Sequence, residues 1–194
     1  MILIDSPFAN IANISRALRA AGAPLEVSAD PSRIAGAEKL VLPGVGSFAA
    51  AMSWLVERRL DAAIREAVNR GTSLLGICVG HQLLFESSSE HGPTRGLGLV
   101  HGSIERFAGA LPVPQIGWNR VAARGPLFDG VEREAFYFVN SYAARDAENE
   151  TATADYDGPF TAAVQRDRVF GVQFHPEKSS AAGLRVLRNF VQWN

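Results

Sequence analysis

Gly76-Ile77-Cys78-Val79-Gly80 decides the fold of this chain. The run before it, Thr72-Ser73-Leu74-Leu75, is typical of a buried strand, and the run after it, His81-Gln82-Leu83-Leu84-Phe85-Glu86, predicts the first turns of a helix. A residue with glycines two positions before and after it can occupy a tight turn between strand and helix, as in a nucleophile elbow, here with cysteine in place of serine. A helix N-terminus also favours the thiolate of such a cysteine. The alternative is a small buried side chain in a core turn.

Strand-like and helix-like segments alternate on the N-terminal side of this turn. Apolar runs predict strands at 2–4, 25–27, 39–42 and 74–77, and helical spacing predicts helices at 11–21, 47–55 and 62–68. Strands that alternate with helices form parallel βαβ units. We therefore expect an α/β fold with an open, doubly wound, flavodoxin-like sheet, mixed but mainly parallel, in one domain over residues 1–194.

The second half of the chain is rich in short β-like pieces. We predict strands at 103–107, 120–123 and 136–139, a hairpin of 160–165 with 169–174, and a closing helix at 181–193. The stretch 146–157 is acidic and rich in alanine and threonine, which predicts a surface loop.

Composition narrows the class of protein. The formal net charge is −1, from 19 basic and 20 acidic side chains, which argues against a general nucleic-acid or membrane-surface binder. The chain has one cysteine, so it forms no internal disulfide, and it has no Cys/His metal spacing. No metal or cofactor is expected. The N-terminal residues lack the features of a signal peptide, and a reducing, cytoplasmic location is the default expectation.

The segment from Gly171 to Ser179 contains Phe174-His175-Pro176-Glu177 at the end of a predicted strand. A cysteine nucleophile needs a base that takes its proton and returns it to a leaving amine, and an imidazole suits this near neutral pH. A carboxylate can orient that imidazole, and Pro176 stiffens the turn between the two. His175 taken alone is more typical of a core or surface histidine, but the pair together with Cys78 favours catalysis.

The turn Pro43-Gly44-Val45-Gly46-Ser47-Phe48 follows the third predicted strand. Acyl transfer places negative charge on a carbonyl oxygen, which backbone N–H groups can stabilise. The N–H of Val79 is one such donor, and a glycine-flanked peptide at Gly44–Val45 can supply the second. The alternative is an ordinary strand-to-helix turn capped by Ser47.

In this order the three motifs resemble the class I (triad) glutamine amidotransferases. More narrowly, the chain is similar to the glutaminase subunits of imidazole glycerol phosphate synthases, which act in histidine biosynthesis. The narrower likeness lies in the turn at 43–48, Pro114-Gln115-Ile116-Gly117-Trp118-Asn119, Tyr137-Phe138-Val139-Asn140-Ser141-Tyr142 and His175-Pro176-Glu177-Lys178-Ser179. It extends over essentially the whole chain.

The resemblance implies a role for each matching residue. Cys78 attacks the carboxamide of glutamine and forms a glutamyl thioester, His175 moves the proton, and Glu177 orients His175. Val79 and Val45 offer N–H groups to the oxyanion. The residues implied in substrate binding are Gly44, Gly46, Gln82, Glu90, Ser141 and Tyr142. On the residues alone, Glu90 is nearly as typical of a solvated surface charge, and Gln82 of a solvent-facing helix position.

The resemblance also implies a partner, a separate (β/α)₈-barrel cyclase or synthase subunit that forms a heterodimer with this chain and receives the ammonia. That subunit joins ammonia to a phosphorylated ribulosyl aminoimidazole-carboxamide, which yields imidazole glycerol phosphate and an aminoimidazole-carboxamide ribotide. Residues that match partner-facing positions are Asn10, Asn13, Trp118 and Lys178. On the residues alone, Trp118 is as typical of core packing, and Lys178 is more typical of a solvated charge unless a carboxylate of the barrel meets it.

The chain departs from this branch at one turn. The family usually carries a Tyr-Gly-x-Gly-Asn-like turn after the first strand, whereas this chain has Asp5-Ser6-Pro7-Phe8-Ala9-Asn10. The change bears on the shape of the partner-facing turn and not on the triad. Two alternatives remain open: an ammonia-supplying subunit of another synthase, for example one that amidates a sugar, and a noncatalytic binding subunit on the same fold.

Overall fold

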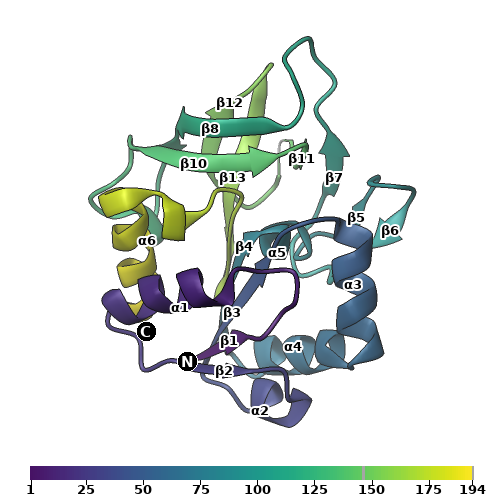
Figure 1. Ribbon diagram of the computed structural model, residues 1–194, viewed down its shortest axis with the longest axis vertical. Helices are drawn as coiled ribbons and strands as arrows, with labels where there is room; N and C mark the ends of the chain where they lie inside the picture. The colour runs from purple at the N-terminus through teal and green to yellow at the C-terminus, as the bar shows by residue number, and fades with distance from the viewer. Residues whose placement is uncertain (146, 194) are drawn as a thin grey trace.

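The computed structural model describes residues 1–145 and 147–193. Its centre is an eight-stranded sheet in the order β2-β1-β3-β4-β14-β13-β12-β9 (Figure 1). The first five strands are parallel, whereas β13, β12 and β9 pair antiparallel. In sheet order, the strands are β2 (Glu26–Ser28), β1 (Ile2–Ile4), β3 (Lys39–Gly44), β4 (Ser73–Cys78), β14 (Val169–Val172), β13 (Pro159–Arg166), β12 (Glu150–Asp155) and β9 (Ala122–Ala123). The predicted mixed, mainly parallel sheet is confirmed.

Helices cover both sides of the parallel strands (Figure 1). α1 (Ile11–Ala20) and α6 (Ser180–Gln192) contact each other, and α4 (Leu60–Asn69) contacts both α2 (Pro31–Ala35) and α3 (Phe48–Glu57). The chain runs outward from β1 to β2 and then returns to β3, so the strand order reverses there. Ligands of open α/β sheets bind beyond the carboxyl ends of strands at such a point. None of the described helices combines the length and apolar character needed to cross a bilayer.

Two smaller sheets lie beyond the carboxyl ends of the parallel strands (Figure 1). In one, β8 (Gln115–Arg120) pairs antiparallel with β10 (Ala135–Asn140). The other has the order β11-β7-β5-β6, from β11 (Tyr142–Ala143), β7 (Ser103–Arg106), β5 (Ser87–Ser88) and β6 (Thr94–Arg95). Short helical turns complete the fold: α5 (Val79–Gln82), η1 (Pro126–Phe128) and η2 (Pro176–Lys178).

Aromatic packing anchors the segment that follows β14. The Phe174 ring stacks on Phe136 with 4.1 Å between ring centroids, and Phe128 and Phe138 meet it edge-on. All four side chains are fully buried, and each contributes about 1.5–3 kcal/mol by leaving water. Because Gln173 and His175 are the chain neighbours of Phe174, this packing fixes the backbone that carries them.

Most predicted elements are present, with ends displaced by one or two residues, but three predictions are wrong. The helix expected from His81 is only α5, because the carbonyl groups of Leu83, Leu84 and Phe85 accept hydrogen bonds from the N–H groups of residues 97–100 instead of continuing a helix. The expected loop 146–157 contains β12, whose Ala152 and Ala154 are buried in alternation with more exposed neighbours. Asp146 itself lies outside the described residues.

The third error concerns the stretch around residue 120. The strand expected at 120–123 is split between the end of β8 and the short β9, and residues 115–119, for which no strand was predicted, form most of β8. α2, which Asp30 caps through a 2.8 Å hydrogen bond from the Ser32 N–H, was not predicted, since five residues are too few for a helical period to be recognised.

Candidate active site

Cys78 ends β4 in a strained backbone conformation, with φ 54° and ψ −112°. A residue other than glycine at positive φ costs on the order of 1–3 kcal/mol, so the surrounding structure must impose this turn. The two flanking glycines do so by allowing the backbones to touch. A Cβ on Gly76 would lie 2.6 Å from the carbonyl oxygen of Gly80, and one on Gly80 would overlap the carbonyl oxygen of Leu42. The predicted elbow is therefore present, and its glycines serve close packing.

His175 is held beside this elbow by backbone contacts. Parallel pairing of Val172 with Ile77 carries the chain after β14 alongside the Cys78 turn. The His175 N–H donates to the carbonyl oxygen of Tyr137 at 2.9 Å, and the Ser179 hydroxyl donates to the His175 carbonyl oxygen at 2.7 Å. Ser179 Oγ also accepts the Tyr137 N–H at 2.9 Å. No role was predicted for Ser179 by itself, since no local sequence pattern indicates these hydrogen bonds to the backbone.

His175 and Glu177 form a buried pair. The imidazole Nδ1 lies 2.8 Å from Glu177 Oε1, and the two side chains are only 4% and 2% exposed. Burial alone lowers the pKa of His175, but interactions with the Cys78 sulfur, and then with the Glu177 carboxylate, raise that pKa to about 10. The imidazolium is therefore favoured at neutral pH, which suits an ion pair with a thiolate.

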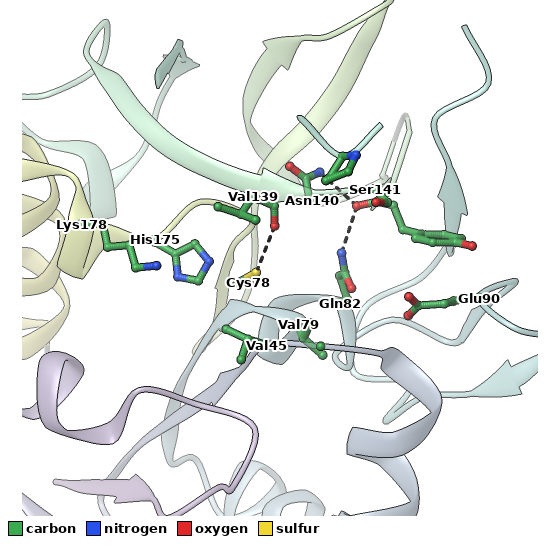
Figure 2. A pocket seen from close by; sticks show the side chains of 13 residues that line it. Val45, Cys78, Val79, Gln82, Glu90, Val139, Asn140, Ser141, His175 and Lys178 are labelled. Atoms are coloured by element: carbon green, nitrogen blue, oxygen red, sulfur yellow. Dashed lines mark hydrogen bonds between the residues drawn. The ribbon is translucent and has the colours of Figure 1, made fainter. Parts of the chain in front are cut away.

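One pocket gathers most of the catalytic and substrate residues predicted from the sequence (Figure 2). Its lining includes Cys78, His175, Val45, Gly46, Val79, Gln82, Glu90, Ser141, Tyr142 and Lys178. The pocket lies beyond the carboxyl ends of β3, β4 and β14, the edge at which open α/β sheets bind ligands. Glu177 lies behind His175, and Gly44 lies under the α5 turn with its Cα facing Gly80; neither lines the pocket.

Two polar side chains in the pocket already have protein partners. Gln82 is buried, and its Nε2 donates to the carbonyl oxygen of Tyr142 and to Gln173 Oε1, both at 3.0 Å. Glu90, which is half-buried, accepts the Phe48 N–H at 2.6 Å, the first N–H of α3. Neither side chain is the solvated group that the sequence left open.

The two predicted oxyanion donors, the N–H groups of Val79 and Val45, differ in their contacts. Val79, the first residue of α5, lines the pocket next to the Cys78 sulfur. The Val45 N–H instead donates to the carbonyl oxygen of Phe8, in the turn where this chain departs from its branch. The peptide between Gly44 and Val45 must therefore rotate before it can serve an oxyanion.

Of the four predicted partner-facing residues, Lys178 lines the pocket, Trp118 lies on β8, and Asn10 and Asn13 lie at the start of α1. Trp118 is 54% exposed, so it is not a core residue, and its ring meets Tyr137 edge-on at 6.2 Å. Lys178 Nζ lies 5.7 Å from the centre of the same Tyr137 ring. Asn10 caps α1 by accepting the Asn13 N–H at 3.0 Å, and α1 contacts the η2 turn that carries Lys178.

Comparison with known proteins finds a family and several relatives that share one name. The family Glutamine amidotransferase class-I matches residues 2–193. Imidazole glycerol phosphate synthase subunit HisH of Geobacillus thermodenitrificans (strain NG80-2) is 47% identical, covering 97% of this chain and 93% of its own. The subunit of the same name from Herpetosiphon aurantiacus is 49% identical, covering 94% and 89%.

Solved structures support the fold. A glutamine amidotransferase crystal structure superposes with a TM-score of 0.79 at 19% identity, covering 98% of this chain and 97% of its own. PurLQS from Thermotoga maritima gives 0.74 at 18% identity, covering 97% and 95%. Sequence and fold thus agree, and the chain belongs to the class I glutamine amidotransferase family, within the group of HisH subunits of imidazole glycerol phosphate synthase.

Proposed function

We propose that this chain is the glutaminase subunit of imidazole glycerol phosphate synthase, which hydrolyses glutamine at Cys78 and passes the ammonia to a separate synthase subunit. The observation that carries this proposal is the pocket that the strained Cys78 turn shares with His175, whose imidazole is held from behind by the buried Glu177 carboxylate. Full-length similarity to HisH subunits supports the choice of synthase over a sugar-amidating one. A reducing compartment keeps the single thiol free, so we propose a cytoplasmic location.

In the first half of the reaction the Cys78 thiolate attacks the side-chain carbonyl carbon of glutamine. The carbonyl π electrons move to oxygen, where the Val79 N–H and a rotated Val45 N–H stabilise the charge. As the tetrahedral intermediate collapses, the C–N bond breaks and the His175 imidazolium gives its proton to the leaving nitrogen. Ammonia departs, and a glutamyl thioester remains on Cys78.

In the second half, neutral His175 takes a proton from water as the water oxygen attacks the thioester carbonyl. The C–S bond then breaks, the new carboxylic acid loses its proton to solvent and leaves as glutamate, and the thiolate–imidazolium pair is restored. Throughout, Glu177 accepts the Nδ1 proton of His175 in a hydrogen bond, so that Nε2 faces the reacting atoms.

Recognition of a free amino acid follows from the pocket's charges. The Glu90 carboxylate attracts the substrate ammonium, while Gln82 and the Ser141–Tyr142 segment hold the rest of the backbone of glutamine. Gly46 leaves room beside the nucleophile, and Gly44 takes part through its peptide with Val45.

The partner is a (β/α)₈-barrel synthase subunit. It docks on a surface of this chain that includes Asn10, Asn13, Trp118 and Lys178. Trp118 is exposed and contacts the Tyr137 ring, over which Lys178 of the pocket also lies, and an exposed tryptophan is typical of an interface anchor. Because Val45 is held by Phe8 in the isolated chain, docking and ligand binding at the barrel can raise glutaminase activity by releasing that peptide.

The test is an assay of the complex with the candidate barrel subunit and its ribotide ligand. Cys78→Ala is expected to abolish synthesis driven by glutamine and to leave synthesis driven by added ammonium salts intact. Wild-type protein with the barrel and ligand should hydrolyse glutamine faster than wild-type protein alone. Loss of both synthetic activities in Cys78→Ala would contradict the division of labour.

A further inference from the structure

Gln173 is a fully buried polar residue to which no role has been assigned. It lies one residue beyond β14, with 0% of its surface exposed. Continuing the parallel register of Val172 with Ile77 places Gln173 beside Cys78, the next residue of β4. Its N–H donates to the Ala162 carbonyl oxygen at 2.9 Å, and neighbouring Phe174 is locked in the aromatic cluster.

Both ends of the Gln173 amide meet residues of the site. Its Nε2 lies 4.0 Å from the Cys78 sulfur, within the reach of an N–H···S hydrogen bond, and its Oε1 accepts from Gln82 Nε2 at 3.0 Å. A side-chain amide has a donor end and an acceptor end, and this contact pattern uses one of each. Burying the group without those bonds would cost free energy, so both contacts are favoured.

The contact between Gln173 and Gln82 determines which way the Gln82 amide faces. Gln82 Nε2 donates to both Gln173 Oε1 and the Tyr142 carbonyl oxygen, so its two N–H groups are used on the protein side. The Gln82 carbonyl oxygen is then left for the pocket that Gln82 lines. A Gln82 amide turned the other way would set its oxygen against two acceptors.

We propose that Gln173 has two roles in glutamine hydrolysis: its N–H supports the thiolate of Cys78, and its carbonyl oxygen positions Gln82 so that Gln82 presents an acceptor to the substrate. It acts on the reacting sulfur directly and on the substrate only through Gln82. Only the second role rests on the proposed glutaminase function, since the first concerns the sulfur whatever it attacks.

The first role is tested by the pH dependence of Cys78 alkylation with iodoacetamide in the full chain. Cys78 is the only cysteine, so all label reports on it. Gln173→Met keeps the length of the side chain and removes both hydrogen bonds. We expect the midpoint of its alkylation profile to move up by about one pH unit, because a hydrogen bond to an anion is lost.

Gln165→Met is the matched control, since Gln165 lies on β13 in the adjoining hairpin and its Nε2 donates to the nearby Asp167 carbonyl oxygen and to no other described residue. Its profile should match wild type. If Gln173→Met does not fold, Gln173→Asn withdraws the amide from the sulfur and should shift the midpoint in the same direction. A folded Gln173 variant with the wild-type midpoint, even one of lowered thermal stability, overturns the first role.

The second role is tested by glutaminase kinetics in the partner complex. Gln82→Met should raise KM about tenfold without moving the alkylation midpoint, whereas Gln173→Met should raise KM and move the midpoint. An unchanged KM in Gln173→Met overturns the positioning of Gln82. Absence of glutaminase activity in the wild-type complex would instead overturn the proposed function, while the alkylation profiles would still decide the first role.

Discussion

The Val45 N–H donates a hydrogen bond to the carbonyl oxygen of Phe8, which keeps one of the two proposed oxyanion donors engaged away from the nucleophile. Phe8 belongs to the turn in which this chain replaces the usual glycines. Its own N–H donates to Ser6 Oγ at 3.2 Å, and its ring meets Trp54 edge-on at 6.5 Å. A turn fixed at both its backbone and its side chain can hold the Val45 peptide in place.

Val45→Gly is expected to raise the glutaminase activity of the chain without its partner. Val45 has a negative φ, and rotating the Gly44–Val45 peptide by about half a turn carries φ to positive values. There a β-branched side chain costs about 1–2 kcal/mol and glycine costs little. We therefore expect roughly a tenfold rise in the basal rate, measured as glutamate release.

Val45→Ala provides the comparison, since it retains Cβ and so keeps most of the cost at positive φ. Its basal rate should rise much less than that of Val45→Gly. Val45 is 41% exposed, so neither change should alter thermal stability strongly. Equal rates in the two variants would show that rotation of this peptide does not limit the isolated chain.

Glu177→Gln should lower kcat for glutamine hydrolysis by about 10²- to 10³-fold in the partner complex, less than Cys78→Ala does. The amide can still contact His175 Nδ1, now 2.8 Å from the carboxylate, but it does not stabilise the imidazolium. Steady-state rates with the barrel subunit and its ligand measure the difference. Glu57→Gln, at a side chain that is 71% exposed, should leave kcat unchanged. Equal losses in Glu177→Gln and Cys78→Ala would mean that Glu177 does more than orient and stabilise.

Burial of His81 should make the fold sensitive to acid. The ring is 0% exposed, lies edge-on to Phe85 at 5.2 Å, and has no hydrogen-bond partner among the described residues. Burial lowers its pKa to about 3. The unfolded chain binds a proton below about pH 6.5 and the folded chain does not, so this contribution to stability is complete above pH 6.5 and is lost as the pH falls.

Between pH 7 and pH 5 the loss amounts to about 2 kcal/mol of unfolding free energy. Urea unfolding of wild type and His81→Met at the two pH values measures it, because methionine fills a similar volume without titrating. The drop should be smaller by about 2 kcal/mol in His81→Met. His91→Met, at an exposed position, should show the same drop in unfolding free energy between pH 7 and pH 5 as wild type. A drop of equal size in all three proteins would show that His81 does not titrate on unfolding.

The catalytic residues could be predicted from the sequence because local motifs contain them. Cys78 lies in a glycine-flanked turn, and His175 and Glu177 lie in a His-Pro-Glu turn. Their meeting follows from strand order, which alternation of strands and helices predicts. Gln173 was not recognisable, because its role depends on the register between β14 and β4 and on the aromatic packing of Phe174.

Contacts between residues that are remote in sequence also explain the errors in the predicted secondary structure. The helix after Cys78 stops early because residues 97–100 supply its carbonyl groups with other donors, and these are remote in sequence. β12 has the composition of a loop, and only its pairing with β13 and β9 makes its alanines core residues. The engagement of Val45 by Phe8 is likewise a contact between two turns, which no local pattern encodes.

Gly80→Ala should destabilise the protein by about 3 kcal/mol or more, since overpacking of this kind forces backbone to move. The new Cβ would overlap the carbonyl oxygen of Leu42 at the centre of the sheet, where β3 and β4 are buried. Gly36→Ala is the matched control: its Cβ would lie 3.4 Å from its nearest neighbour, the Ser32 carbonyl oxygen. Urea unfolding of both variants measures the contrast. Wild-type stability in Gly80→Ala would mean that α5 can shift away from β3, and the strained turn at Cys78 would then need another cause than close backbone packing.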